Sequence, residues 1–219
     1  MDKNPTSARS YGLCGGAAGI AGVVLLLVSF AINSGPPANA TGAELMKFGQ
    51  QNYAKILWGA WMQALGPVLM VFFALSLVHL AGAAHRLAGW MTLFGATVLM
   101  TVSVIEITFY ISALHADPAI MPFISLKLIS AVQHLYFMIA APALFLPLGI
   151  VLLGSPLLPR VFGYLALLMA LVFASLGVIF LLNLTLPAGV TAVAGIQGFW
   201  WLAAAIALLV RSGKLTRKA

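Results

Sequence analysis

The chain has 219 residues, of which 63% are hydrophobic and only 7% are charged, and its mean hydropathy is +1.08. A water-soluble domain carries about 25% charged residues and cannot bury so much apolar surface in so small a volume. The composition therefore excludes a soluble enzyme, a nucleic-acid-binding domain and a disordered tail. It predicts an all-α protein whose solvent is lipid, where a spanning helix needs about 20 apolar residues.

Six apolar segments are long enough to cross a membrane as helices. The chain is therefore expected to form a single integral membrane domain, a polytopic transmembrane helical bundle of six spans, with residues 33–55 as its one long connection. The predicted spans cover about 15–32, 56–80, 87–111, 124–153, 161–182 and 189–210.

The first span has a competing interpretation as a cleaved secretory signal. Lys3 and Arg9 precede its apolar stretch, and Ala38-Asn39-Ala40 after it resembles an A-x-A cleavage site. A stretch of about 18 residues is longer than the roughly 7–15 of a signal, which favours a retained helix.

The long connection carries a helix-start signal of its own. Gly35-Pro36-Pro37 ends the first helix, and Thr41 and Glu44 have capping-box spacing. The pattern predicts a short helix that runs to about Tyr53 and lies near the lipid head groups.

The small residues of the first span predict a close helix–helix contact. Gly12 and Gly16, Gly15 and Gly19, and Ala18 and Gly22 are pairs four residues apart, which lets two backbones approach. The neighbour is a helix of the same chain, a second copy, or a partner membrane protein. In the later spans, Pro67, Pro142 and Pro147 are expected to bend their helices.

Charge predicts the orientation. Of the 11 Lys and Arg residues, one side of the bundle holds Lys3, Arg9, Arg86, Arg160, Arg211, Lys214, Arg217 and Lys218, and the other holds Lys47, Lys55 and Lys127. Positively charged loops resist translocation, so both termini are expected in the cytoplasm. The basic residues beside the last span are expected to contact anionic membrane lipids rather than nucleic acid. The Ala-, Gly- and Leu-rich composition favours a bacterial inner membrane.

Polar side chains inside the spans are the most informative feature. Glu106 is the only acidic residue within a predicted span, and His134 is the only histidine well inside one. An acid there costs at least ~2.5 kcal/mol on insertion scales, so it needs a partner or a role. The helical rise of about 1.5 Å per residue places Gln63, Ser130, Gln133 and Gln197 at similar depths in the outer half.

Spacing on two helices predicts a shared polar face. On the third span Ser103, Glu106 and Tyr110 lie at i, i+3 and i+7, and on the fourth span Lys127, Ser130 and His134 repeat that spacing. The short connection between these spans makes them antiparallel neighbours. Glu106 is therefore expected to meet Lys127, Ser130 or His134.

Two interpretations of these groups stay open. They form a structural network that locks helices together, or they line an outward-facing pocket that binds a small molecule or carries a proton. In the second case the candidate ligand-binding residues are Glu106, His134, Gln63, Gln133, Ser130, Lys127, Tyr110 and Gln197. Burial and Lys127 would move the Glu106 charge state in opposite directions, so the sequence leaves it open.

The sequence lacks the residues that haem binding, zinc binding and catalysis would require. His79 and His85 lie at the inner boundary and His115 at the outer one, so His134 has no histidine at its depth to share a haem. One histidine and one glutamate are too few for zinc, and Cys14 is the single cysteine. The sequence predicts no cofactor, no metal site and no catalytic set. The tryptophans Trp58, Trp61, Trp200 and Trp201 are expected to be membrane-interface anchors.

Three functions fit this pattern. The first is binding or moving a small molecule or ion in an outward-facing polar pocket, with Glu106 as the proton-responsive group. The second is an accessory or structural subunit of a membrane complex, which needs only the helix-ordering network. The third is an intramembrane enzyme on a lipid or isoprenoid, with Glu106 and His134 as acid and base.

Overall fold

A computed structural model describes residues 5–33, 40–115, 121–182 and 187–214, which form helices without a strand. Six helices are long and apolar enough to cross a membrane, as predicted. Five of them are α1 (Pro5–Ile32), α2 (Gly42–Leu80), α3 (Leu87–His115), α6 (Arg160–Leu181) and α7 (Pro187–Lys214). The remaining span joins α4 (Met121–Leu135), the π-helical turn η1 (Tyr136–Ala140) and α5 (Ala141–Leu153).

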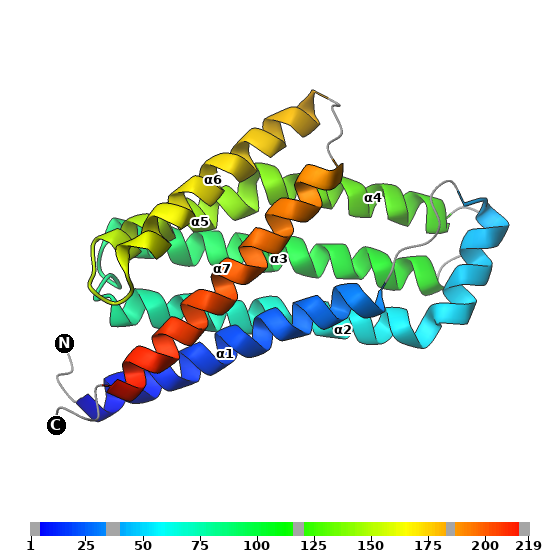
Figure 1. Cartoon of the computed structure of the whole chain (residues 1–219). Coiled ribbons are helices and arrows are strands. Elements are labelled where there is room, and N and C mark those ends of the chain that lie inside the picture. Colours follow the sequence, from blue (N-terminus) through cyan, green and yellow to red (C-terminus); the bar gives the residue numbers. More distant parts are fainter. Residues whose placement is uncertain (1–4, 34–39, 116–120, 183–186, 215–219) are drawn as a thin grey trace.

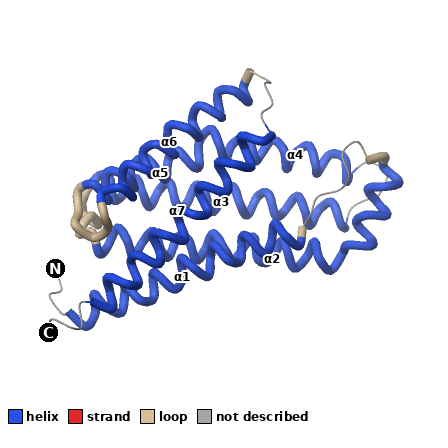
Figure 2. Tube along the Cα trace, in the orientation of Figure 1, coloured by secondary structure: helices blue, strands red, loops and turns tan. Residues whose placement is uncertain are grey.

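The helices form one bundle in which α7 returns to α1 (Figure 1). Neighbours in the chain pack together from α1 to α6, but α7 lies mainly along α1 and diverges from α6. The tube in Figure 2 shows the same helical path from end to end. The start of α1 and the end of α7 lie at the same end of the bundle, as an even number of spans requires.

The helix α2 includes the residues that were predicted to form a separate short helix before it. The capping box is confirmed: the Thr41 backbone N–H donates to Glu44 Oε2 over 2.7 Å, and the Glu44 N–H donates to Thr41 Oγ1 over 3.4 Å. From this cap the helix continues without a break through Pro67 to Leu80, so a separate short helix was the wrong expectation. At about 1.5 Å per residue its path is about 58 Å long, which exceeds a hydrocarbon layer of about 30 Å, and Figure 1 shows its first turns bent away from the rest of the helix. The proposed cleavage motif falls mostly outside the described residues.

The glycine face of α1 packs within the chain. A Cβ on Gly22 would lie 2.8 Å from the Gly66 carbonyl oxygen of α2, and one on Gly16 would lie 3.1 Å from the Ala205 carbonyl oxygen of α7. Side chains at these positions would force the backbones apart. Of the neighbours that the sequence left open, helices of the same chain occupy this face.

The fourth span leaves α-helical geometry just before Pro142. The Ala141 N–H donates to the Tyr136 carbonyl oxygen five residues back, which makes the turn a π-helix. Proline cannot donate a backbone hydrogen bond, so the helix before it is free to widen. The extra residue per turn changes the direction in which Tyr136 and Phe137 project, and both line the cavity described below.

An aromatic cluster fills the centre of the bundle. Phe73 of α2, Phe145 of α5, Phe173 of α6 and Trp201 of α7 are almost completely buried. The Phe145 ring stacks on Phe173 with centroids 6.0 Å apart, and it contacts Trp201 at 5.5 Å. This cluster fixes α7 against three other helices, and one of its members, Trp201, also lines the candidate site.

Candidate ligand-binding cavity

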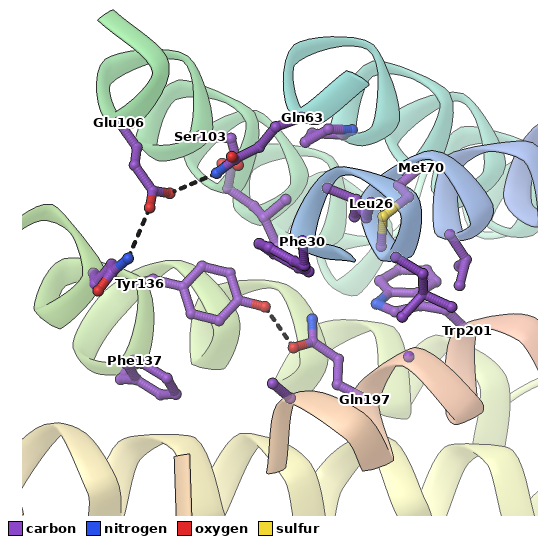
Figure 3. Close-up of a pocket in the computed structure, with 17 residues that line it drawn as sticks. Leu26, Phe30, Gln63, Met70, Ser103, Glu106, Tyr136, Phe137, Gln197 and Trp201 are labelled. Carbon is purple, nitrogen blue, oxygen red and sulfur yellow. Dashed lines mark hydrogen bonds between the residues drawn. The ribbon is translucent and has the colours of Figure 1, made fainter. Parts of the chain in front are cut away.

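A cavity of about 280 Å³ lies between α1, α2, α3, η1 and α7, with α4 at its edge (Figure 3). Most of its wall is apolar, with contributions from Val23, Leu26, Phe30, Met70, Leu99, Phe137 and Trp201. Its polar side chains come from five different elements and are Gln63, Ser103, Glu106, Gln133, Tyr136 and Gln197. An apolar enclosure with a few convergent polar groups is typical of a small-molecule site, and this volume is near the small end of the usual ~300–1,000 Å³.

Glu106 accepts hydrogen bonds from two helices. Gln63 Nε2 of α2 donates to Glu106 Oε2 over 3.0 Å, and Gln133 Nε2 of α4 donates to Oε1 over 2.9 Å. Gln63 is only 5% exposed, whereas Gln133 lies at the outer surface of the bundle. The two carboxamides orient the carboxyl group without adding an opposite charge. A carboxylate has about four lone-pair sites, so two remain for a ligand.

A second hydrogen bond links the π-helical turn to α7. The Tyr136 hydroxyl donates to Gln197 Oε1 over 2.6 Å, and Gln197 is 8% exposed (Figure 3). Ser103 is different, because its hydroxyl donates to the Leu99 carbonyl oxygen of its own helix. The Tyr136–Gln197 pair therefore sets the position of α7 at the cavity, and Ser103 contributes little more than a small polar surface.

The indole of Trp201 carries a donor that has no acceptor. Trp201 is 1% exposed, yet its Nε1–H has no hydrogen-bond partner in the described structure, a property shared only with Ser155 Oγ among the buried side-chain atoms described. An unsatisfied buried donor costs about 1–3 kcal/mol. Its neighbour Trp200 has no such deficit, since Nε1 donates to the Phe162 carbonyl oxygen over 3.1 Å.

The sequence predicted similar depths for Glu106, Gln63, Gln133 and Gln197, and all four side chains border this cavity. The expected contact on α4 differs. Glu106 meets Gln133, while the His134 ring packs on Phe180 of α6 with centroids 5.0 Å apart. Successive helical residues are rotated by about 100°, so turning Gln133 toward α3 turns His134 toward α6.

The other predicted residues lie around the site rather than in its wall. Tyr110 is half-buried on α3, one turn beyond Glu106, and Lys127 is exposed on α4, almost two turns before His134. The side chain of Ser130 lies outside the described residues.

Two lining side chains that carry a hydrogen-bonding group were missed, and both are aromatic. Tyr136 and Trp201 follow Gln133 and Gln197 by three and four residues, which puts them on the same helical faces. That spacing was the available signal. Trp201 was wrongly interpreted as an interface anchor, and Trp200 is also buried. Trp58 and Trp61 are 59% and 54% exposed, which suits membrane contact.

A second hollow of about 340 Å³ lies between α6 and α7. Its wall is apolar throughout and consists of Phe162, Leu165, Leu168, Met169, Val172, Val193, Ile196, Phe199, Trp200 and Ala203. We call it the α6–α7 groove. Without a convergent polar side chain it offers no means of orienting a ligand.

The described residues hold no cluster of three or more His, Cys, Asp or Glu side chains that could bind a metal ion. No family model matches the chain, and no similar protein was found among curated proteins or solved structures. Function is therefore inferred from the geometry of the cavity.

Proposed function

We propose that the protein binds a small amphipathic molecule in the cavity between α1, α2, α3, η1 and α7. The observation that supports this best is the convergence of polar side chains from five elements on one mostly apolar space. A helix-ordering network needs no hollow beside it, because close-packed side chains satisfy one another directly. Here the polar groups border a space large enough for a small organic molecule.

Glu106 is the group that binds the polar end of this molecule. Gln63 and Gln133 hold its two oxygens from opposite sides and leave lone pairs for a ligand donor. Protonation would remove the negative charge and weaken this interaction, so binding or transport would respond to pH. The apolar part of the molecule would lie against Leu26, Met70 and Leu99.

We also propose which membrane contains the protein and how the protein is oriented in it. Six membrane-spanning helices make this an integral membrane protein. We place it in a bacterial inner membrane with both termini in the cytoplasm, following the excess of Lys and Arg at the end where α1 begins and α7 ends. Glu106 then lies in the outer half of the bilayer, and the cavity belongs to the outward-facing half of the bundle.

A second function, an accessory or structural subunit, has one observation in its favour. The two hydrogen bonds of Glu106 join α2, α3 and α4, three helices whose order in the bundle they help to fix. In that case the polar groups act only on one another, and a partner polypeptide binds elsewhere on the bundle.

Glu106→Gln separates the two functions. The variant keeps a hydrogen-bonding side chain of the same size, and Gln63 or Gln133 can rotate its carboxamide to match. We expect native mass spectrometry of gently extracted wild-type protein to show a bound small molecule, which the variant loses while its melting temperature changes by less than about 4 °C. Thr101→Val, which removes an exposed hydroxyl on the same helix, is the control and should retain the molecule. A bare wild-type protein and a sharply destabilised Glu106→Gln would favour the structural subunit.

A further inference from the structure

Trp201, whose indole donor is unsatisfied, is one of the residues that line the same cavity. Figure 3 shows its indole across the cavity from Glu106, with the nitrogen on the side of Gln197. The residue is 1% exposed, so bulk water does not replace the absent acceptor. Buried donors are nearly always paired, and an exception calls for an explanation.

Packing explains why the indole is held there without an internal partner. Its ring contacts Phe73 at 5.8 Å, Phe145 at 5.5 Å and Trp200 at 5.0 Å between centroids. These aromatic contacts fix the ring plane, and aromatic carbon offers no strong acceptor for the N–H. The cluster therefore holds the donor in one direction instead of letting it turn toward a backbone carbonyl.

A second donor lies one turn earlier on α7. Gln197 precedes Trp201 by four residues, so both project from one face of the helix. Its Oε1 is occupied by the Tyr136 hydroxyl, which leaves the Nε2 group to donate. Figure 3 shows this nitrogen on the Trp201 side of the carboxamide.

We propose that the ligand carries a hydrogen-bond-accepting oxygen, such as a ketone or quinone carbonyl, and that Trp201 Nε1–H donates to it. Gln197 Nε2 is the second donor to the same oxygen. The inference rests on the proposed function and narrows its ligand class: a mostly apolar molecule with a donor toward Glu106 and a carbonyl acceptor toward α7. Trp201 is thus a binding residue that recognises an atom, beyond its place in the aromatic core.

Acetophenone and α-methylstyrene test this contact, because they have nearly the same shape and differ by C=O against C=CH₂. We would titrate each into purified protein in nanodiscs and follow the indole ¹H–¹⁵N resonances of the five tryptophans. Trp201→Phe assigns the Trp201 signal, and Trp200→Phe is the matched control. Acetophenone should move the Trp201 resonance downfield and bind about three- to tenfold tighter than α-methylstyrene, as a net hydrogen bond predicts.

Further variants separate the outcomes. Thr101→Val, which lies on α3 outside the cavity wall, should leave the affinity for acetophenone unchanged, while Trp201→Phe should remove the preference over α-methylstyrene. If both probes bind equally and Gly198→Leu in the cavity wall blocks both, the carbonyl contact is wrong and the proposed cavity function survives. If neither probe binds the wild-type protein, or both bind Gly198→Leu as tightly as wild type, the carbonyl contact and the cavity function are both contradicted. Phe substitutions at the other four tryptophans assign the Trp201 signal by elimination, so the resonance shift in wild-type protein decides the first point even if Trp201→Phe folds poorly.

Discussion

The two hollows beside α7 have similar volumes and very different walls. Ala194, Gln197, Gly198 and Trp201 form the α7 side of the polar cavity, and the α6–α7 groove takes the opposite face of the same helix. The groove is the larger, at about 340 Å³ against 280 Å³, yet polar side chains gather only at the other. Space alone is common where helices diverge in a membrane. The polar groups directed into it distinguish a candidate site.

The adjacent residues Trp200 and Trp201 differ in the same way as the two hollows that they border. Trp200 borders the groove and satisfies its N–H on the Phe162 carbonyl oxygen, so its wall is complete. Trp201 borders the cavity and leaves its N–H unpaired. The groove, where the N–H of Trp200 already has an acceptor, can be covered by lipid alone. The cavity, where the N–H of Trp201 has no acceptor, lacks a polar partner.

The largest effect should come from a topology experiment, because it decides whether the polar cavity lies in the outer or the cytoplasmic half of the bundle. In a Cys14→Ser background, Gln50→Cys at the start of α2 should react with a membrane-impermeant maleimide in intact cells. His85→Cys, between α2 and α3, should react only after lysis. Both native residues are exposed, so the two labels have comparable access. The reverse pattern would put the cavity in the cytoplasmic half.

The next largest difference is expected when a large side chain on α7 fills one hollow or the other. Ala194→Phe projects into the polar cavity and Ala203→Phe into the groove, and both alanines are exposed. Ala194→Phe should weaken ligand binding by at least about tenfold, equivalent to ~1.4 kcal/mol, and Ala203→Phe should change it less than twofold. Calorimetry with the co-purified molecule would measure both affinities. Equal losses would mean that the hollows are not functionally distinct.

A smaller and pH-dependent effect is expected from Glu106. In the proposed site its ionised form binds the ligand donor, so wild-type affinity should fall as the pH drops through the pKa of this residue, and Glu106→Gln should show a flat profile. Tyr110 on the same helix and Tyr136 on η1 interact electrostatically with Glu106.

His134→Gln is the control for that profile, because His134 packs on Phe180 and away from the carboxyl group. Its affinity should follow the wild-type pH curve. A curve that disappears in His134→Gln and persists in Glu106→Gln would transfer the proton-responsive role to the histidine.

The smallest effect should come from Ser103. Its hydroxyl donates to the Leu99 carbonyl oxygen within α3, so it borders the cavity without reaching across it. Ser103→Ala should alter both ligand affinity and unfolding free energy by no more than about 0.5 kcal/mol. A larger loss of affinity, measured in the same calorimeter, would show that this hydroxyl turns toward the ligand.

The sequence was sufficient for the six helices, because span length and hydrophobicity depend on local composition. It also predicted similar depths for Glu106, Gln63, Gln133 and Gln197, because depth follows from counting residues along a helix. Rotation about each helix axis was harder. The choice of Gln133 over His134 as the partner of Glu106 depends on how α4 packs between α3 and α6, which no single helix encodes.

The sequence did not predict the aromatic residues of the site, Tyr136 and Trp201, because their positions depend on two tertiary features. The π-helical turn before Pro142 changes the direction of Tyr136, and a proline alone does not specify a π-turn over a simple bend. Trp201 looked like an interface anchor because tryptophan is common at membrane boundaries. Its burial results from α7 returning to α1 across the aromatic cluster, a contact between the two ends of the chain.

Ligand occupancy in two glycine variants of α7 is the sharpest test of a ligand site in the polar cavity. A Cβ on Gly195 or Gly198 would meet no other atom within 4 Å, and only Gly198 lines the polar cavity. Native mass spectrometry should therefore find the bound small molecule in wild type and Gly195→Leu and not in Gly198→Leu. Equal occupancy in all three proteins, or none in any of them, would contradict a ligand site in this cavity.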